Sequence, residues 1–188
     1  MNEQFTKNLI EAMVHAKGIV NIRNEGEEPF LLKSGRRSRF FIDVKRASLD
    51  PGILTCMADA VMGLGLIHPY CDRIASVAVG GIPLATMLSV ATGIPQVIVR
   101  EEKHPTGMQS QVIGDCMGLD VVLVEDVATT GGSIIKAVDA INAAGAGKCQ
   151  VALVVVDREE GATEACLVEG ISLYPLLRKR DFGVLEGS

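Results

Sequence analysis

The sequence predicts an α/β fold with a mostly parallel central sheet flanked by helices. Short runs rich in β-branched residues, such as "IASVAV" at 74–79 and "DVVLVED" at 120–126, alternate with stretches of helical period. These runs are apolar along their whole length, which indicates strands buried on both faces, as in parallel sheets covered by helices. A length of 188 residues fits one domain. We expect N-terminal hood elements over about 1–48 and a core over about 49–188.

The N-terminal part is expected to form a helix and then a hairpin. Residues 2–16 carry apolar side chains at helical spacing, and "FLLKSGRRSRFFID" at 30–43 indicates two strands joined by a polar turn. After "SLDPG" at 48–52, a helix is predicted over 52–66 with Pro51 near its first turn.

The rest of the chain alternates strand and helix more regularly. Further strands are expected at 95–101, at 149–157 and within "GISLYPLLRKR" at 170–180. Helices are expected within 80–93, over 132–147 and once more before the last strand.

Composition narrows the possible partners and compartment. A net charge of −5 gives no electrostatic reason to expect nucleic acid or an anionic membrane, and no apolar run approaches the ~18 residues of a membrane span. The five cysteines are scattered without a CxxC pair, and the three histidines lie far apart. We therefore expect reduced thiols in a cytoplasmic protein and no His/Cys metal cage.

The stretch "VVLVEDVATTGGS" at 121–133 is the strongest functional signal. It places a polar turn at the carboxyl end of a buried strand and at the start of a helix, where free N–H groups and the helix dipole favour an anion. Glycines let the backbone come close, and hydroxyls add donors. The predicted phosphate-binding residues are Ala128, Thr129, Thr130, Gly131, Gly132 and Ser133, and Val127 just before them is expected to bind the same ligand.

Two acids precede this turn and identify the rest of the ligand. Glu125 and Asp126 are acceptors when ionised, so they call for hydroxyl donors or for a metal. A sugar phosphate with free 2′- and 3′-hydroxyls satisfies both halves of the motif, which predicts a phosphoribosyl ligand. The lysine of a P-loop is missing, and G-x-G-x-x-G is absent. The less specific interpretation is a buried strand that ends in solvated acids before a capped helix.

With these residues the chain resembles the type I phosphoribosyltransferases over nearly its whole length, and most closely the members that act on orotate. "LKSGRRSRFFID" at 32–43 resembles the segment that covers the base in that family. The resemblance implies that Lys33 contacts pyrophosphate, and that Phe41, together with Phe40, packs on the pyrimidine ring. Taken alone, the segment would be read as a basic hairpin with a buried aromatic pair.

Two further segments carry the resemblance. "VVVDREEG" at 154–161 implies that Arg158, with Thr129, binds the carboxylate of orotate; without the resemblance, Arg158 would be a surface partner of a neighbouring glutamate. "VAVGGIPLA" at 77–85 implies backbone N–H groups that face pyrophosphate. Many bacterial relatives have a lysine where this chain has Gly80, so one cationic contact is absent or supplied elsewhere.

The segment "VREEKHPTG" at 99–107 resembles the mobile catalytic loop of the family, with departures. Arg100 and Gly107 keep the family spacing, but His104 stands at the lysine position and Lys103 falls one place early. The resemblance implies that Arg100, Lys103 and His104 bind pyrophosphate, and it leaves open whether Lys103 or His104 is the catalytic cation. It also implies a homodimer in which loop 100–107 reaches the neighbouring subunit's site.

The resemblance implies a pentosyltransferase of pyrimidine (UMP) biosynthesis. Ribose 5-phosphate would pass from phosphoribosyl pyrophosphate to orotate with Mg²⁺ held mainly by pyrophosphate, and Lys103, Glu125 and Asp126 would be catalytic. Two alternatives remain. One is a purine-type phosphoribosyltransferase, which would share the 125–133 motif. The other is a non-catalytic regulator that senses phosphoribosyl pyrophosphate.

Overall fold

The computed structural model describes residues 3–16, 19–23, 26–31, 37–67, 71–101 and 111–182. Its centre is a six-stranded sheet in the order β10-β9-β8-β5-β6-β7. The strands of this sheet are β5 (Arg73–Val77), β6 (Gln96–Val99), β7 (Val112–Ile113), β8 (Asp120–Ala128), β9 (Lys148–Asp157) and β10 (Ser172–Arg178). All neighbours pair in parallel except β6 and β7, which are antiparallel. The predicted mostly parallel sheet is confirmed.

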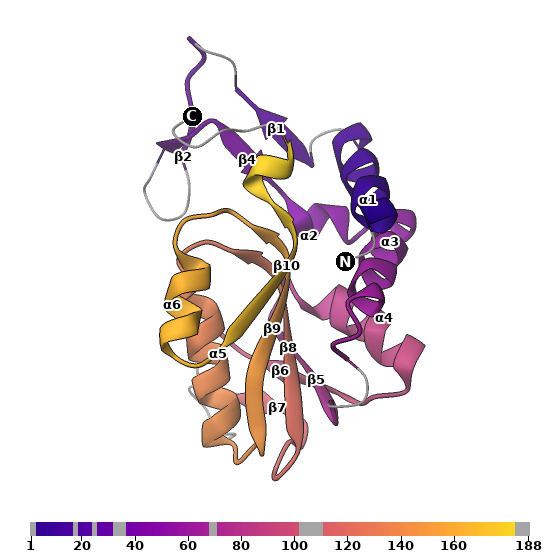
Figure 1. The fold of residues 1–188 in the computed structure, drawn as a ribbon, viewed down its shortest axis with the longest axis vertical. Coiled ribbons are helices and arrows are strands. Elements are labelled where there is room, and N and C mark those ends of the chain that lie inside the picture. Colours follow the sequence, from indigo (N-terminus) through magenta and orange to yellow (C-terminus); the bar gives the residue numbers. More distant parts are fainter. Residues whose placement is uncertain are drawn as a thin grey trace.

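Helices cover both faces of this sheet (Figure 1). Figure 1 shows α1 (Glu3–His15), α3 (Pro51–Gly63) and α4 (Ile82–Thr92) on one side, with α5 (Gly132–Ala143) and α6 (Ala162–Val168) on the other. Each face has its own apolar cluster: Leu88 and Met57 belong to one, and Ile134 and Ile141 to the other. Burial on both faces explains why the strand sequences are continuously apolar.

The ends of the predicted helices have local causes. The Asp50 carboxylate accepts hydrogen bonds from the backbone N–H groups of Gly52 and Ile53 at 2.9 and 3.0 Å, and Pro51 takes the first turn of α3, where its missing N–H costs nothing. At the start of α5, Gly131 has a φ of 84°. A Cβ there would also lie 3.2 Å from the Ala162 carbonyl oxygen, so the turn requires glycine.

The N-terminal elements differ from the expected single hairpin. Instead, β2 (Phe30–Leu31) pairs with β3 (Arg37–Ser38), and β4 (Phe40–Ile42) pairs with β1 (Val20–Ile22). The Phe40 side chain is fully buried in the same apolar cluster as α1 and α3, so burial draws β4 away from a simple hairpin partner. The short helix α2 (Val44–Ala47), which follows β4, was also not predicted.

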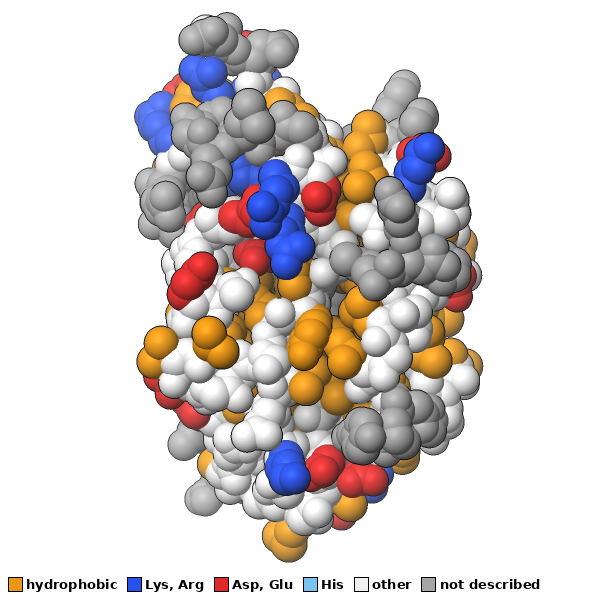
Figure 2. Space-filling model, viewed as in Figure 1, with side chains coloured by type: hydrophobic (Ala, Val, Ile, Leu, Met, Phe, Trp, Pro, Cys, Tyr) orange, Lys and Arg blue, Asp and Glu red, His pale blue; other side chains and the backbone are white. Residues whose placement is uncertain are grey.

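The last element that the structure describes is the 3₁₀ helix η1 (Lys179–Phe182), which lies against the N-terminal elements (Figure 1). The Phe182 ring lies 5.5 Å from the Phe40 ring. On the face drawn in Figure 2, hydrophobic side chains lie across the middle of the molecule, and charged side chains gather above them. Within the described ranges, the structure contains no helix with the length and apolarity that a membrane span requires.

Candidate functional site

The candidate site lies at the carboxyl edge of the sheet, where β5 and β8 are neighbours. The chain leaves β5 through α4 to β6 on one side, and leaves β8 through α5 to β9 on the other, so the strand order reverses between them. Ligands of open α/β sheets bind at such a reversal. The 121–133 motif therefore occupies the position at which this fold binds ligands.

The predicted phosphate turn has the expected local form. β8 ends at Ala128, a turn follows at 129–131, and α5 begins at Gly132. Thr130, Gly132 and Ser133 are exposed there, whereas Gly131 is buried against α6. The first N–H groups of a twelve-residue helix thus open toward solvent beside two hydroxyls, an arrangement that suits an anion.

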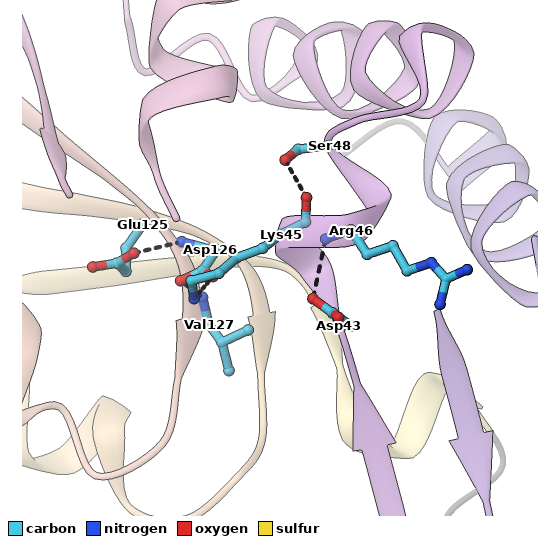
Figure 3. Close-up of polar contacts among 7 residues, drawn as sticks. All are labelled: Asp43, Lys45, Arg46, Ser48, Glu125, Asp126 and Val127. Carbon is cyan, nitrogen blue, oxygen red and sulfur yellow. Dashed lines mark hydrogen bonds and ion pairs between the residues drawn. The ribbon is translucent and has the colours of Figure 1, made fainter. Parts of the chain in front are cut away.

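The two acids are buried within β8 and do not end it. Glu125 is 4% exposed and Asp126 is 7% exposed. Glu125 accepts a hydrogen bond from the Asp126 N–H, and Asp126 accepts one from the Val127 N–H, each at 2.9 Å (Figure 3). The alternative in which these acids are merely solvated is therefore wrong.

Burial changes the protonation of this pair. Desolvation, followed by the hydrogen bond and the negative charge of Asp126, raises the pKa of Glu125 to about 9. Glu125 is then protonated at neutral pH and adds no negative charge of its own to the pair. A neutral Glu125 can also donate a hydrogen bond, which a carboxylate cannot.

Lys45 of α2 completes this charge arrangement. Its Nζ lies 2.5 Å from Asp126 Oδ2, although the two residues are 81 positions apart (Figure 3). Partial burial lowers the pKa of Lys45, but the hydrogen bond and the charge of Asp126 outweigh it and raise this pKa overall. Lys45 is therefore a permanent cation at neutral pH.

Gly80 lies on another side of the same carboxylate. A Cβ at Gly80 would lie 2.3 Å from Asp126 Oδ2 and 2.4 Å from its Cγ. Real Cβ atoms do not approach so closely, so the loop after β5 can contact Asp126 only with glycine at this position. A side chain at position 80 would not fit beside Asp126 in its present position.

A cavity of about 440 Å³, the hood cavity, opens beside these groups. It is lined by Leu31, Phe41, Ile42, Asp43, Val44, Lys45, Asp126, Val127, Thr129, Arg158 and Glu160. The structure thus brings together three predicted base-site residues, Phe41, Thr129 and Arg158, with the acid Asp126. Its size and its mixture of one aromatic ring with a few charges are typical of a small-molecule site.

Arg158 is held in the wall of the hood cavity. Its Nη2 donates a hydrogen bond to the Phe40 carbonyl oxygen at 3.3 Å, and its Nε lies 3.1 Å from Glu160 Oε1. The predicted neighbours Phe40 and Phe41 have different positions. Phe41 is 37% exposed and lines the cavity, whereas the Phe40 ring is buried in the core beneath the Arg158 guanidinium, with 6.0 Å from that group to its centroid.

Comparison with known proteins identifies the family. Residues 71–170 match the phosphoribosyl transferase domain. The chain is 42% identical to the orotate phosphoribosyltransferase of Methanopyrus kandleri over 81% of each chain. It is 38% identical to that of Methanothermobacter thermautotrophicus over 97% of this chain and 98% of the relative. The solved orotate phosphoribosyltransferase of Mycobacterium tuberculosis in complex with 5-phospho-α-D-ribosyl 1-diphosphate is 27% identical, covers 96% of this chain and 99% of its own, and has a TM-score of 0.75.

The chain belongs to the orotate phosphoribosyltransferase family. The family predicted from the 121–133 motif is confirmed, and with it an enzyme of the phosphoribosyltransferase class. The matched range begins at Cys71, so β5, β8 and the phosphate turn lie inside it, whereas the N-terminal elements lie before it.

Arg100, another predicted site residue, does not line the hood cavity. It lines a second cavity of about 290 Å³, the edge cavity, together with Ser133 of the phosphate turn and Lys136 of α5. Thr129, by contrast, lines the hood cavity. The turn at 129–133 therefore stands between the two cavities.

Three predicted pyrophosphate contacts, Lys33, Lys103 and His104, lie outside the described residues, as does most of loop 100–107. Sequence reasoning missed Lys45, because "DVKRAS" at 43–48 has no motif that distinguishes one lysine from an ordinary surface lysine. Its nearness to Asp126 depends on how α2 packs against β8, which no local pattern encodes.

Proposed function

We propose that this protein transfers ribose 5-phosphate from phosphoribosyl pyrophosphate to N1 of orotate, giving orotidine 5′-monophosphate and pyrophosphate in pyrimidine (UMP) biosynthesis. The observation that carries the proposal is one sheet edge that combines an exposed helix N-terminus, two buried carboxyls and a cavity with an arginine and an aromatic ring. Each feature matches one part of the two substrates.

The donor occupies the turn and the acids. The N–H groups and hydroxyls of residues 128–133 bind the 5′-phosphate. Val127, before them in β8, is a further proposed donor-binding residue. Asp126 accepts from a ribose hydroxyl, and Glu125, protonated in the folded protein, takes part as donor or acceptor. As the C1–oxygen bond lengthens, positive character on the sugar is stabilised by the charge of Asp126.

The acceptor occupies the hood cavity. Phe41 is partly exposed there and offers a ring face to the flat pyrimidine, while Arg158 offers a two-pronged donor to the orotate carboxylate, with Thr129 beside it. The buried Phe40 supports this wall, since its carbonyl oxygen holds Arg158. We propose that Glu160 occupies the guanidinium until orotate displaces it.

Pyrophosphate leaves toward cationic groups. Arg100 is placed at the sheet edge beside Ser133, and we propose that Lys33, Lys103 and His104 join it when loop 100–107 closes and excludes water. Mg²⁺ suits this site, because it binds through substrate phosphates with few protein carboxylates, and Asp126 faces the cavity as one such carboxylate. Bound there, it would neutralise charge on the leaving pyrophosphate.

The assembly and compartment follow the same proposal. We propose a homodimer in which loop 100–107 of each subunit reaches the other's site, which sedimentation and mixed-subunit complementation would test. All five cysteines lie among the described residues and are free thiols, which supports a reducing, cytoplasmic setting.

The decisive test is orotate consumption, followed by its ultraviolet absorbance, with Mg²⁺ and phosphoribosyl pyrophosphate present. Adenine, hypoxanthine and uracil are offered in parallel. The proposal expects turnover with orotate and none comparable with the other bases. Turnover of a purine would favour the purine-type alternative, and tight binding of phosphoribosyl pyrophosphate without turnover of any base would favour the regulator.

A further inference from the structure

Lys45 is fixed in place by its own short helix. The Asp43 carboxylate accepts a hydrogen bond from the Arg46 N–H at 3.0 Å, and the Ser48 hydroxyl donates to the Lys45 carbonyl oxygen at 2.7 Å (Figure 3). Val44 and Ala47 anchor the other side of α2 in the core. Both ends of the helix are therefore tied down, and the Lys45 side chain projects toward β8.

The Asp126 carboxylate is enclosed by three groups. Its Oδ1 accepts from the Val127 N–H, its Oδ2 meets Lys45 Nζ, and Gly80 lies so close that a Cβ would collide with it. This carboxylate has little freedom while Lys45 is paired with it. A ligand that needs Asp126 as an acceptor must compete with the Lys45 ammonium or share the carboxylate with it.

The Lys45 ammonium is the mobile member of this group. Its side chain is 58% exposed, whereas that of Asp126 is 8% exposed, so the lysine can turn into the cavity at little desolvation cost and the aspartate cannot leave. Both residues line the hood cavity, and Gly80, next to Asp126, belongs to the loop after β5. The ammonium therefore reaches the space between the acids and that loop.

We propose that Lys45 is a pyrophosphate-binding residue that holds Asp126 in the free enzyme and transfers its ammonium to the pyrophosphate group when the donor binds. This inference rests on the function proposed above. Asp126 then accepts from the ribose hydroxyls. When the C1–oxygen bond breaks, its electron pair goes to the pyrophosphate oxygen. The new bond forms between C1 and N1 of orotate, and the proton of N1 leaves to pyrophosphate or water. Lys45 stays protonated throughout and supplies charge where the leaving group gains it.

The closeness of Gly80 to Asp126 supports this assignment. Because any side chain at position 80 would displace Asp126, the loop after β5 cannot place a cation on that side of the carboxylate. Lys45 approaches from the opposite element, α2, and supplies a cation at the same carboxylate. The positive charge beside Asp126 thus comes from α2 and not from the loop after β5.

The test compares Lys45→Met, which keeps the length and removes the charge, with Lys45→Arg, which keeps the charge. Lys148→Met serves as the control, because Lys148 begins β9 at the far end of the sheet. Initial rates give KM for both substrates, and calorimetry gives the dissociation constants of pyrophosphate with Mg²⁺ and of ribose 5-phosphate. Thermal melts report folding.

Lys45→Met is expected to weaken pyrophosphate binding and to raise KM for phosphoribosyl pyrophosphate by about tenfold or more, the usual effect of losing one charge-assisted contact. KM for orotate and the affinity for ribose 5-phosphate should stay within about twofold. Lys45→Arg should recover most of the loss, and Lys148→Met should behave as wild type.

If Lys45 had only a structural role, Lys45→Met would have a lower melting temperature. It would also bind both substrates and ribose 5-phosphate more weakly, all to a similar degree. That outcome, or unchanged pyrophosphate affinity in Lys45→Met, overturns the proposal. Calorimetry distinguishes failure of the Lys45 proposal from failure of the proposed function. Wild-type protein that binds pyrophosphate but consumes no orotate would contradict the function and leave the Lys45 assignment intact. Wild-type protein that binds no pyrophosphate would sink the assignment itself.

Discussion

Glu125 and Asp126 are adjacent in the sequence, yet their surroundings give them different chemistry. Glu125 is buried without a cation at hydrogen-bond distance among the described residues, and its pKa rises to about 9, chiefly because of that burial. Asp126, by contrast, forms an ion pair with Lys45. One strand thereby presents a neutral acid and a carboxylate side by side at neutral pH, which suits a sugar with two neighbouring hydroxyls.

Replacing Glu125 by Gln should change how stability depends on pH. Between its ordinary pKa of 4.5 and its folded pKa of about 9, Glu125 is ionised in the unfolded chain but protonated in the folded one. The free energy of unfolding therefore falls as pH rises through this window, by up to about 1.4 kcal/mol for each unit between the two pKa values. Glu125→Gln removes this decline, so its melting temperature should fall less than that of wild type between pH 5 and pH 9. If the melting temperatures of wild type and Glu125→Gln fall equally with pH, the raised pKa of Glu125 is contradicted.

Asp126→Asn should abolish most turnover and leave the fold intact. The variant keeps the size of the side chain but loses the charge that meets Lys45 and the developing positive charge on the sugar. We expect kcat to fall by about 100-fold or more, with a circular dichroism spectrum like that of wild type. Activity near the wild-type level would remove Asp126 from the ribose site.

Arg158→Ala should weaken the binding of orotate far more than the binding of phosphoribosyl pyrophosphate. The guanidinium lines the hood cavity and is tied to the Phe40 carbonyl oxygen and to Glu160. Loss of a two-pronged contact with a carboxylate should raise KM for orotate by about 10- to 100-fold. Arg158→Lys keeps the charge without the planar fork and should recover little. Equal changes in both KM values would place Arg158 outside the base pocket.

At the scale of elements, the site is made where segments distant in sequence meet across β8. The loop after β5 contacts Asp126 through Gly80, α2 contacts it through Lys45, and the turn into α5 follows directly. Because parallel strands end at one edge, these loops converge without long insertions. The chemistry therefore depends on how closely the loops approach the strand.

Gly80→Ala should disturb Asp126 directly. The added carbon would lie 2.3 Å from Oδ2, so the carboxylate must move away from Lys45 or the loop must shift. We expect a loss of about 1–3 kcal/mol in the free energy of unfolding, together with a lower kcat. The control is Gly52→Ala in α3, where the new carbon meets the Asp50 carboxylate at 3.2 Å and is far from the site. If Gly80→Ala and Gly52→Ala change kcat and the free energy of unfolding equally, the close approach of Gly80 to Asp126 does not matter for function.

At the scale of the whole molecule, an N-terminal strand and the C-terminal η1 pack together behind the wall of the hood cavity. β4 carries Phe40 and Phe41, and η1 returns at the C-terminal end to pack Phe182 against Phe40. The Phe40 carbonyl oxygen in turn holds Arg158. The base side of the site thus rests on a contact between N-terminal and C-terminal elements.

Phe182→Ala should test this linkage. Removing a buried ring should lower the free energy of unfolding by about 3 kcal/mol, measured by urea denaturation. KM for orotate should also rise, because Phe40 and Arg158 lose their support, while KM for phosphoribosyl pyrophosphate should change less. Phe182→Leu keeps most of the volume and should remain close to wild type. An unchanged KM for orotate would show that η1 does not support the base pocket.

The sequence by itself determined the sheet, the turn at 129–131 and the family, because each is written in local patterns: apolar runs, a strand–acid–turn–helix string and helix caps. Tertiary structure alone decided that Lys45 pairs with Asp126, that Gly80 must be glycine, and that Phe40 is core while Phe41 faces the cavity. These depend on the packing of α2, β4 and the β5 loop against β8. A contact between residues 81 positions apart leaves no periodicity in the sequence from which it could be read.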